Sequence, residues 1–431
     1  MIISSQGEAC SPNDDINALD LNGTNALRDR LRQIQANSAG GEAALLAEAE
    51  INLGVEQAEK EQEKQAKIER AKQALQDFRS YLAQSPYRAA QALPSEEELV
   101  YNYNPNTQEC EISRQDGQDI ELDLSGSNLQ GDLPLPPQLM VTRLGCGRNQ
   151  LKTLPDLPAS LTKLDCSTNQ LTTLPELPAS LTWLDCNYNK LTALPELPTS
   201  LTRLDCGDNQ LTTLPKLPDS LTKLECTENK LTTLPELPDS LTELWCDSNQ
   251  LTALPEIPAS LTGLQCDTNQ LTALPELPYS LTELICHDNQ LTAIPKLPTS
   301  LTRLYCSGGK LTTLPELPAS LTELFCGQNQ LTTLPELPAS LRDLYCGDNQ
   351  LTTLPKLPAG LTELECGQNQ LTTLPELPAS LRDLNCSSNQ LIALPELPDS
   401  LSSLDCRYNP NLATDQASLK AISDRGGEVY S

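Results

Sequence analysis

A 20-residue repeat constrains the fold of this chain more than any other feature of its sequence. Thirteen units follow one another without a gap over residues 151–410, with the consensus L-T-x-L-x-C-x-x-N-Q-L-T-x-L-P-E-L-P-A-S. Two less regular units precede them at 141–149 and 120–129. A unit this short cannot bury a core alone and must stack on its neighbours. The spacing therefore predicts a solenoid of about 15 coils.

Each unit divides into a strand and an extended return. In the segment 161–169, Leu161, Leu164 and Cys166 are expected to point inward, while Lys163 and Asp165 alternate to the other face. The second half carries two prolines, which lack an N–H and restrict φ, so it cannot be helical. We therefore predict a leucine-rich-repeat solenoid with short parallel strands on the concave face. Its convex side is expected to be extended or polyproline-like.

Cysteine and asparagine each recur once per coil, as ladders from Cys146 to Cys406 and from Asn149 to Asn409. A zinc site needs ligands that converge, and parallel side chains do not converge. In-register cysteines are also poorly oriented for disulfides, so we expect small buried thiols, no metal and no cofactor. Free thiols suit a reducing cytosol.

The asparagine amides are expected to bond backbone groups at the turn that ends each strand. The single gap in this ladder is Gly309. It is either a tolerated lapse with weaker hydrogen bonding or a flexible point, and we favour the lapse.

The charge balance disfavours several functions. The chain has 58 acidic and 29 basic residues, for a net charge of −29, and such a field repels nucleic acids and anionic lipids. No run of 18 apolar residues is present, so membrane insertion is not expected. The N-terminal residues also lack the pattern of a secretory signal peptide.

Catalytic residues are not recognisable in the sequence. His287 is the single histidine, and no nucleophile elbow, phosphate-binding loop or zinc-protease motif occurs. The repeated glutamates, such as Glu176 and Glu196, are expected to form a solvated convex ladder. We therefore predict that the protein is not an enzyme.

Sequence variation points to the working surface. Most repeat positions barely change, while the third, fifth, seventh and eighth residues vary, and these carry most aromatic residues of the repeats. Because core packing would place aromatics inward, this bias favours recognition of a protein partner, with an apolar anchor and a basic rim. The alternative is that the rings simply stack as cross-strand pairs. The predicted contact residues on the concave face are Trp183, Tyr188, Trp245, Ile285, Tyr305, Phe325 and Tyr345, with acidic Glu243, Glu283, Glu323 and Asp343.

The chain is predicted to divide into three regions. Residues 1–118 form an α-helical N-terminal region with a linker, 119–410 the solenoid, and 411–431 a C-terminal cap containing a short helix at 414–424. Helices are expected at about 24–38 and 42–84. An apolar stripe, which we expect to pack on one partner helix, either caps the solenoid or dimerises the protein. The stripe consists of Ile68, Ala71, Leu75, Phe78 and Leu82.

The repeat L-P-E-L-P-A-S-L-x-x-L-x-x-x-x-N-Q-L resembles that of the leucine-rich-repeat effectors of enteric bacteria, of the IpaH/SspH/YopM type. The resemblance covers 151–410. It implies delivery into host cells, where the repeats bind host proteins. Many members also carry a C-terminal ubiquitin-ligase domain with a catalytic cysteine. No cysteine follows Cys406 here, so we do not expect that activity.

Three functional hypotheses follow. The first is a bacterial effector, secreted by a dedicated system into the host cytoplasm, that binds host proteins as a scaffold. The second is a resident bacterial interaction protein with no host target. The third, which we favour least, is a ubiquitin-ligase-related enzyme or subunit.

Overall fold

The structure of the protein is a computed structural model that describes residues 2–3, 9–10, 29, 32–33, 42–85, 93–104, 108–413 and 416–431. Apart from three positions, the helix predicted at 24–38 lies outside the described residues. The chain forms two compact units, which are described separately below. The first comprises Met1–Leu122 and Pro134–Thr142, and the second Asp123–Leu133 and Arg143–Ser431.

The first unit contains a long helix and an antiparallel hairpin. The helix expected at 42–84 is present as α2, Glu42–Leu82. A 3₁₀ turn, η3, at Glu96–Glu98 leads into β3, Leu99–Asn104, which pairs with β4, Glu109–Arg114. Short strands β1, Ile2–Ile3, and β2, Ala9–Cys10, also pair antiparallel. The hairpin lies within residues 1–118, after the predicted helices, where only a linker was predicted.

The apolar stripe of α2 packs against this hairpin. Ala71, Leu75, Phe78 and Leu82 are all buried, and α2 contacts both β3 and β4. The prediction of one partner helix for this stripe was therefore wrong. A helical stripe with three-to-four spacing fits a sheet face as well as another helix, so the pattern alone did not identify its partner.

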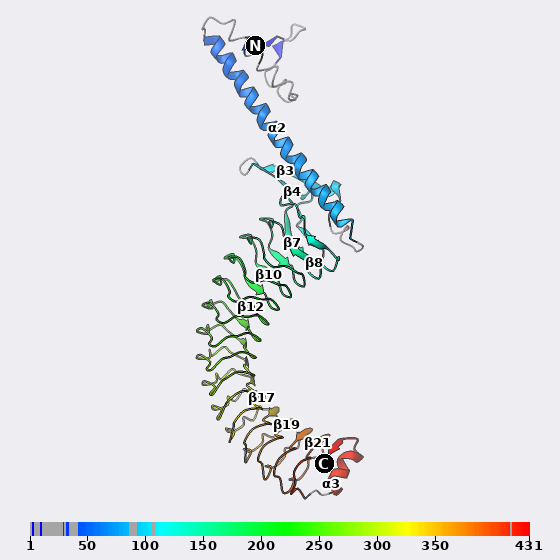
Figure 1. Ribbon diagram of the computed structural model, residues 1–431, viewed down its shortest axis with the longest axis vertical. Coiled ribbons are helices and arrows are strands. Elements are labelled where there is room, and N and C mark those ends of the chain that lie inside the picture. The colour runs from blue at the N-terminus through cyan, green and yellow to red at the C-terminus, as the bar shows by residue number, and fades with distance from the viewer. Residues whose placement is uncertain are drawn as a thin grey trace. The chain divides into compact units, whose positions relative to one another are not determined.

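A 16-stranded sheet runs from β5 to β22 and forms the spine of the solenoid (Figure 1). From β7 to β22 its neighbouring strands pair in parallel, and from β9 to β21 residues 20 apart lie side by side. A separate two-stranded sheet joins β6, Gln130–Asp132, to β8, Gln150–Thr153. The strands of the main sheet up to β21 are β5 Ile120–Asp123, β7 Val141–Gly145, β9 Lys163–Asp165, β10 Trp183–Asp185, β11 Arg203–Asp205, β12 Lys223–Glu225, β13 Glu243–Trp245, β14 Gly263–Gln265, β15 Glu283–Ile285, β16 Arg303–Tyr305, β17 Glu323–Phe325, β18 Asp343–Tyr345, β19 Glu363–Glu365, β20 Asp383–Asn385 and β21 Ser403–Asp405.

The C-terminal end of the sheet is closed by a helix and a further strand. The helix predicted at 414–424 is α3, Gln416–Asp424, and Gly426 follows it with a φ of 84°. The chain then returns as β22, Glu428–Tyr430, which pairs with β21. The sequence did not predict this last strand.

Burial within each coil follows the predicted alternation. Leu161, Leu164 and Cys166 have no exposed surface, whereas Lys163 and Asp165 are half-buried on the opposite side of the strand. The return segments of the regular coils contain no helix, as their prolines require. The second unit is therefore a leucine-rich-repeat solenoid. In Figure 1 its strands line the inner side of an arc.

The leucines of the return segment differ in burial according to the residue before them. Where that residue is glutamate, the leucine is half-buried, as at Leu177. Where it is lysine, the leucine is at most 5% exposed. Burial of this leucine thus coincides with lysine at the preceding position, whose aliphatic stem can lie on apolar surface while its charge stays in water. The lysine–leucine pairs are Lys216–Leu217, Lys296–Leu297 and Lys356–Leu357.

Candidate functional site

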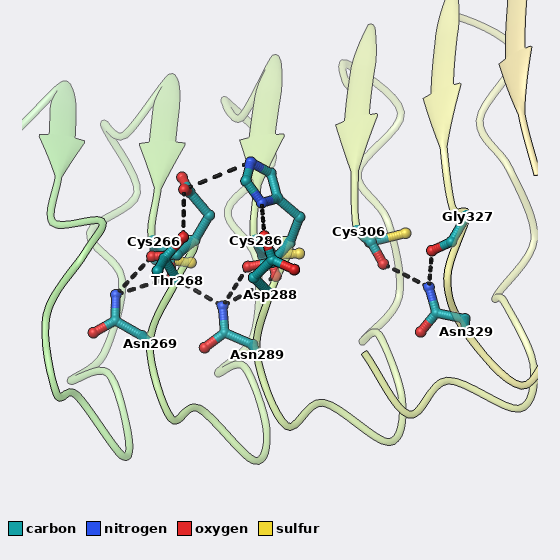
Figure 2. A network of polar contacts seen from close by, with 11 residues as sticks. Cys266, Thr268, Asn269, Cys286, Asp288, Asn289, Cys306, Gly327 and Asn329 are labelled. Atoms are coloured by element: carbon teal, nitrogen blue, oxygen red, sulfur yellow. Dashed lines mark hydrogen bonds and ion pairs between the residues drawn. The ribbon is translucent and has the colours of Figure 1, made fainter. Parts of the chain in front are cut away.

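The asparagine ladder holds the coils at fixed spacing. The Asn169 amide donates to the Cys146 carbonyl of the preceding coil at 3.0 Å and to the Cys166 carbonyl of its own coil at 3.1 Å. Its Oδ1 accepts the Leu151 N–H at 2.9 Å. Figure 2 shows the Asn289 amide donating to the Cys266 carbonyl of the preceding coil and to the Cys286 carbonyl of its own coil. The predicted role of asparagine at the strand end is thus confirmed, and each amide also bonds two coils together.

Gly309 interrupts this ladder between Asn289 and Asn329 (Figure 2). The N–H groups on either side of the gap, of Leu271 and Leu311, each donate to an asparagine Oδ1 at 3.0 Å. The equivalent N–H of Leu291 has no asparagine Oδ1 to donate to, because residue 309 is a glycine. The expected loss of hydrogen bonding at this coil is confirmed.

The eighth residue of each coil flanks the strand face in a left-handed conformation. Thr268 has a φ of 51° and Tyr188 a φ of 54°, whereas Gly308 takes the same place with a φ of 66°. Tyr188 therefore lies in the turn after β10, and 59% of its surface is exposed. It was predicted to lie on the concave face, but its position is at the border of that face.

The fifth residues of successive repeats lie side by side on neighbouring strands and form a column. Within it, the rings of Tyr305 and Phe325 lie 4.5 Å apart at 59°, and those of Phe325 and Tyr345 lie 4.1 Å apart at 12°. All three side chains are half-buried. The Tyr305 hydroxyl donates to the Glu323 carboxylate, and burial together with this bond raises the pKa of Tyr305 to about 12. We call Trp245, Ile285, Tyr305, Phe325 and Tyr345 the aromatic column.

The N-terminal end of the aromatic column is covered by a lysine. Lys223 Nζ lies 3.5 Å from the centre of the Trp245 ring and 3.1 Å from a carboxylate oxygen of Glu243. Ile285, two strands further on, pairs in register with Tyr305. Lys223 therefore covers the Trp245 ring through a cation–π contact while it is ion-paired with Glu243. Lys223 is not among the predicted contact residues.

The acidic third-position residues interact mainly with groups of the same face. Glu283 lies 3.5 Å from Arg303, and Asp343 accepts a hydrogen bond from the Thr362 hydroxyl at 3.0 Å. Glu323 accepts the Tyr305 hydroxyl. The structure thus brings these predicted acidic residues beside the aromatic column. There they fix the orientation of their neighbours as well as contribute negative charge.

Glycines border the C-terminal part of the aromatic column. Gly327, Gly347 and Gly367 occupy the seventh position of three successive coils. A Cβ at Gly327 would lie 3.0 Å from the Gly347 carbonyl oxygen, so the backbone approaches closely here. The rings of Phe325 and Tyr345 therefore have no side chain at the seventh position of their own coils. Glycine at the variable seventh position of three successive coils was the signal for this feature in the sequence. It was not used in the prediction of the site.

Four acidic residues occupy the same column nearer the N-terminus, namely Asp165, Asp185, Asp205 and Glu225. Only 1% of the Asp205 side chain is exposed, and its Oδ2 accepts Trp183 Nε1 at 3.0 Å and Arg203 Nε at 2.6 Å. Burial is the main cause that raises the pKa of Asp185 to about 6 and that of Glu225 to about 7. The predicted contact residue Trp183 is thus tied into this acidic group.

The remaining candidates for chemistry are His287 and the cysteine ladder. His287 lies 3.5 Å from Asp267 and 3.1 Å from Asp288. Within the described ranges, no three His, Cys, Asp or Glu side chains are arranged to hold a metal ion. The cysteines from Cys146 to Cys406 are free and buried. Among the helices that the structure describes, none is both long and apolar enough to cross a membrane.

Solved structures of other leucine-rich-repeat proteins resemble this chain. YopM from Yersinia enterocolitica is 41% identical, with a TM-score of 0.60, over 67% of this chain and 62% of its own length. A leucine-rich-repeat protein of Leptospira interrogans is 27% identical, with a TM-score of 0.51, over 71% of this chain and 82% of its own. No protein-family model and no curated protein matches the chain.

YopM from Yersinia pestis, described as a leucine-rich effector protein, is 37% identical to this chain, with a TM-score of 0.64. The match covers 72% of this chain and 88% of that YopM. On this identity and coverage, the chain belongs to the family of leucine-rich-repeat proteins that contains YopM.

Proposed function

We propose that this protein is a non-enzymatic interaction scaffold that binds another protein through the aromatic column. The observation that carries this proposal is the stack of Tyr305, Phe325 and Tyr345 on the strand face, outside the leucine and cysteine core. Aromatic side chains that are partly buried and held in one orientation lose little entropy when a partner covers them. Such residues are the ones that dominate binding energies at protein interfaces.

Cross-strand stacking explains part of the column without any partner. The Tyr305–Phe325–Tyr345 contacts are such pairs, as the alternative interpretation expected. Beside the rings, three successive coils carry glycine at the seventh position, namely Gly327, Gly347 and Gly367. No seventh-position side chain of their own coils therefore lies next to Phe325 and Tyr345. We therefore regard stacking as the preorganisation of a binding surface.

The charge around the column indicates the kind of partner. Glu283, Glu323 and Asp343 surround the rings, and the whole chain carries a net charge of −29. A partner with an apolar anchor and a basic rim would complement this surface and would be steered toward it. Increasing the salt concentration should accordingly slow association more than it accelerates dissociation.

Membership of the YopM family supports a further step, that the protein is a bacterial effector delivered into host cells. Translocation of a reporter fused to residues 1–118 tests delivery. If the reporter stays in the bacterium under every secretion condition that delivers a known effector, the resident-scaffold hypothesis replaces the effector hypothesis.

Binding is tested by affinity capture from host-cell lysate with the wild type and with Trp245→Ala/Phe325→Ala. Tyr279→Ala is the matched control, because Tyr279 is 84% exposed in the return segment and remote from the strand face in sequence position. The double variant should recover its specific partner at least about tenfold less well, since two interface hot spots together exceed 1.4 kcal/mol. Equal recovery by the double variant and the wild type would reject the aromatic column as the contact surface.

A further inference from the structure

The hydrogen bonds of the Asp205 carboxylate are incomplete. Its side chain is 1% exposed, and Oδ2 already accepts from Trp183 and Arg203. The other oxygen, Oδ1, is equally buried but has no partner among the described residues. A buried carboxylate oxygen without a donor is costly, so its position calls for a nearby hydrogen.

Glu225 is placed to supply that hydrogen. Strands β11 and β12 pair Asp205 with Glu225 in register, so the two carboxyl groups project from the same face of adjacent strands. The Asn187 amide donates to Glu225 Oε1 at 3.4 Å, which leaves Oε2 able to carry a proton. Two ionised carboxylates at this spacing would repel, whereas one proton between them turns the repulsion into an O–H···O bond.

We propose that Asp205 and Glu225 form a proton-binding pair, in which protonated Glu225 donates to Oδ1 of Asp205. The ligand of this site is a single proton. The pair lies in the coils that precede the aromatic column, with Glu225 in register beside Trp245.

The charged groups around the pair come from five neighbouring strands. Asp165 of β9 and Asp185 of β10 add negative charge, as does Glu243 of β13. The nearby cations are already engaged, because Arg203 bonds Asp205 and Lys223 lies against Trp245 and Glu243. Burial, followed by the charge of Asp205, accordingly outweighs Lys223 and raises the pKa of Glu225 to about 7.

The proton links this site to stability. Glu225 is protonated in the folded protein but ionised in the unfolded chain at pH values between its ordinary pKa of 4.5 and about 7. The folded state therefore binds the extra proton in this range, and the contribution of the pair to stability falls as pH rises toward 7. Above about pH 7 both states have lost the proton, and the contribution stays constant.

The test is a carboxyl-carbon NMR titration of the full-length protein labelled with ¹³C-glutamate, with the Glu225 signal assigned by its loss in Glu225→Gln. The expected midpoint is about 7, and Asp205→Asn should move it to lower pH. Urea unfolding gives a second readout. Glutamine retains an N–H donor at every pH, so the advantage of Glu225→Gln over the wild type should grow from pH 5 to pH 7 and then level off.

The control is Glu228→Gln, which makes the same substitution at an exposed carboxyl that contacts Asp208. Solvent screening should leave its urea midpoint close to that of the wild type across this pH range. A Glu225 titration midpoint near 4.5 would overturn the proposal. It would be overturned equally if Glu225→Gln and Glu228→Gln had the same pH profile. Neither result would bear on whether the aromatic column binds a partner.

Discussion

A single amide type determines how the coils of this protein are held together. Each asparagine of the ladder donates to carbonyls of two successive coils and accepts a backbone N–H, as Asn169 does from Leu151. At a net contribution of about 1 kcal/mol per hydrogen bond, these side-chain bonds add to the backbone bonds that join neighbouring coils. The sequence predicted the role of the asparagine because it recurs at one position. The bonding across two coils could not be predicted, because it depends on side-chain geometry.

Gly309→Asn should stabilise the coils around it. The new amide would accept the Leu291 N–H and bond the Cys286 and Cys306 carbonyls, as Asn289 does one coil earlier. We expect an increase of about 1 kcal/mol in the free energy of unfolding, measured by urea denaturation. Asn289→Gly should have the opposite effect, because it leaves the Leu271 N–H and the bonded carbonyls without their asparagine partner. No change in either variant would contradict this role of the ladder.

The left-handed residue of each coil offers a second test at this scale. A β-branched side chain such as that of Thr268, at a φ of 51°, is strained by about 1 kcal/mol. Thr268→Gly should therefore raise the urea midpoint even though it removes a side chain. Gly308→Thr, the reverse change at a φ of 66°, should lower it, both through this strain and because its Cβ would clash with Asp288 Oδ1. The account of backbone strain fails if both substitutions move the midpoint in the same direction.

At the scale of elements, periodicity identified the strands and the prolines identified the return segments, because both patterns repeat in every coil. The hairpin of β3 and β4 was missed, since it occurs once and its alternation extends over only six residues per strand. The partner of α2 was assigned wrongly for a related reason, because an apolar stripe does not specify what covers it. The solenoid could be predicted from the sequence because its pattern repeats. The elements outside the solenoid occur once and have no such repetition.

The cysteine ladder leads to a prediction at this scale. Burial raises the pKa of Cys306 and of Cys346 to about 12, so almost no thiolate is present at neutral pH. The ladder thiols should therefore resist a thiol-specific reagent at pH 8 in the native protein and react fully in denaturant. The measurement is the number of thiols labelled over time under the two conditions, by mass spectrometry. If the cysteines of the ladder, from Cys146 to Cys406, are labelled rapidly in the native protein, the ladder is not a buried structural feature.

Over the whole molecule, sequence and structure agree on a repeat scaffold whose variable residues gather on the strand face. The sequence placed the aromatic column by counting positions. The register of β13 to β18 confirms that its members lie in one row, with Gln265 between Trp245 and Ile285 and the other members on adjacent strands. The contacts that these side chains make could not be predicted from the sequence. The cover of Lys223 over Trp245 and the tyrosine–glutamate bonds depend on which rotamers fit together between coils.

The central claim is that the aromatic column is the surface that a protein partner covers. Hydrogen–deuterium exchange of the captured complex tests it most directly, since protection can be mapped along all coils in one experiment. We predict protection in peptides that contain β13 to β18, and little change in return-segment peptides around Tyr279. Protection confined to the return segments or to α2, with the strands of the column exchanging as in the free protein, would contradict the claim.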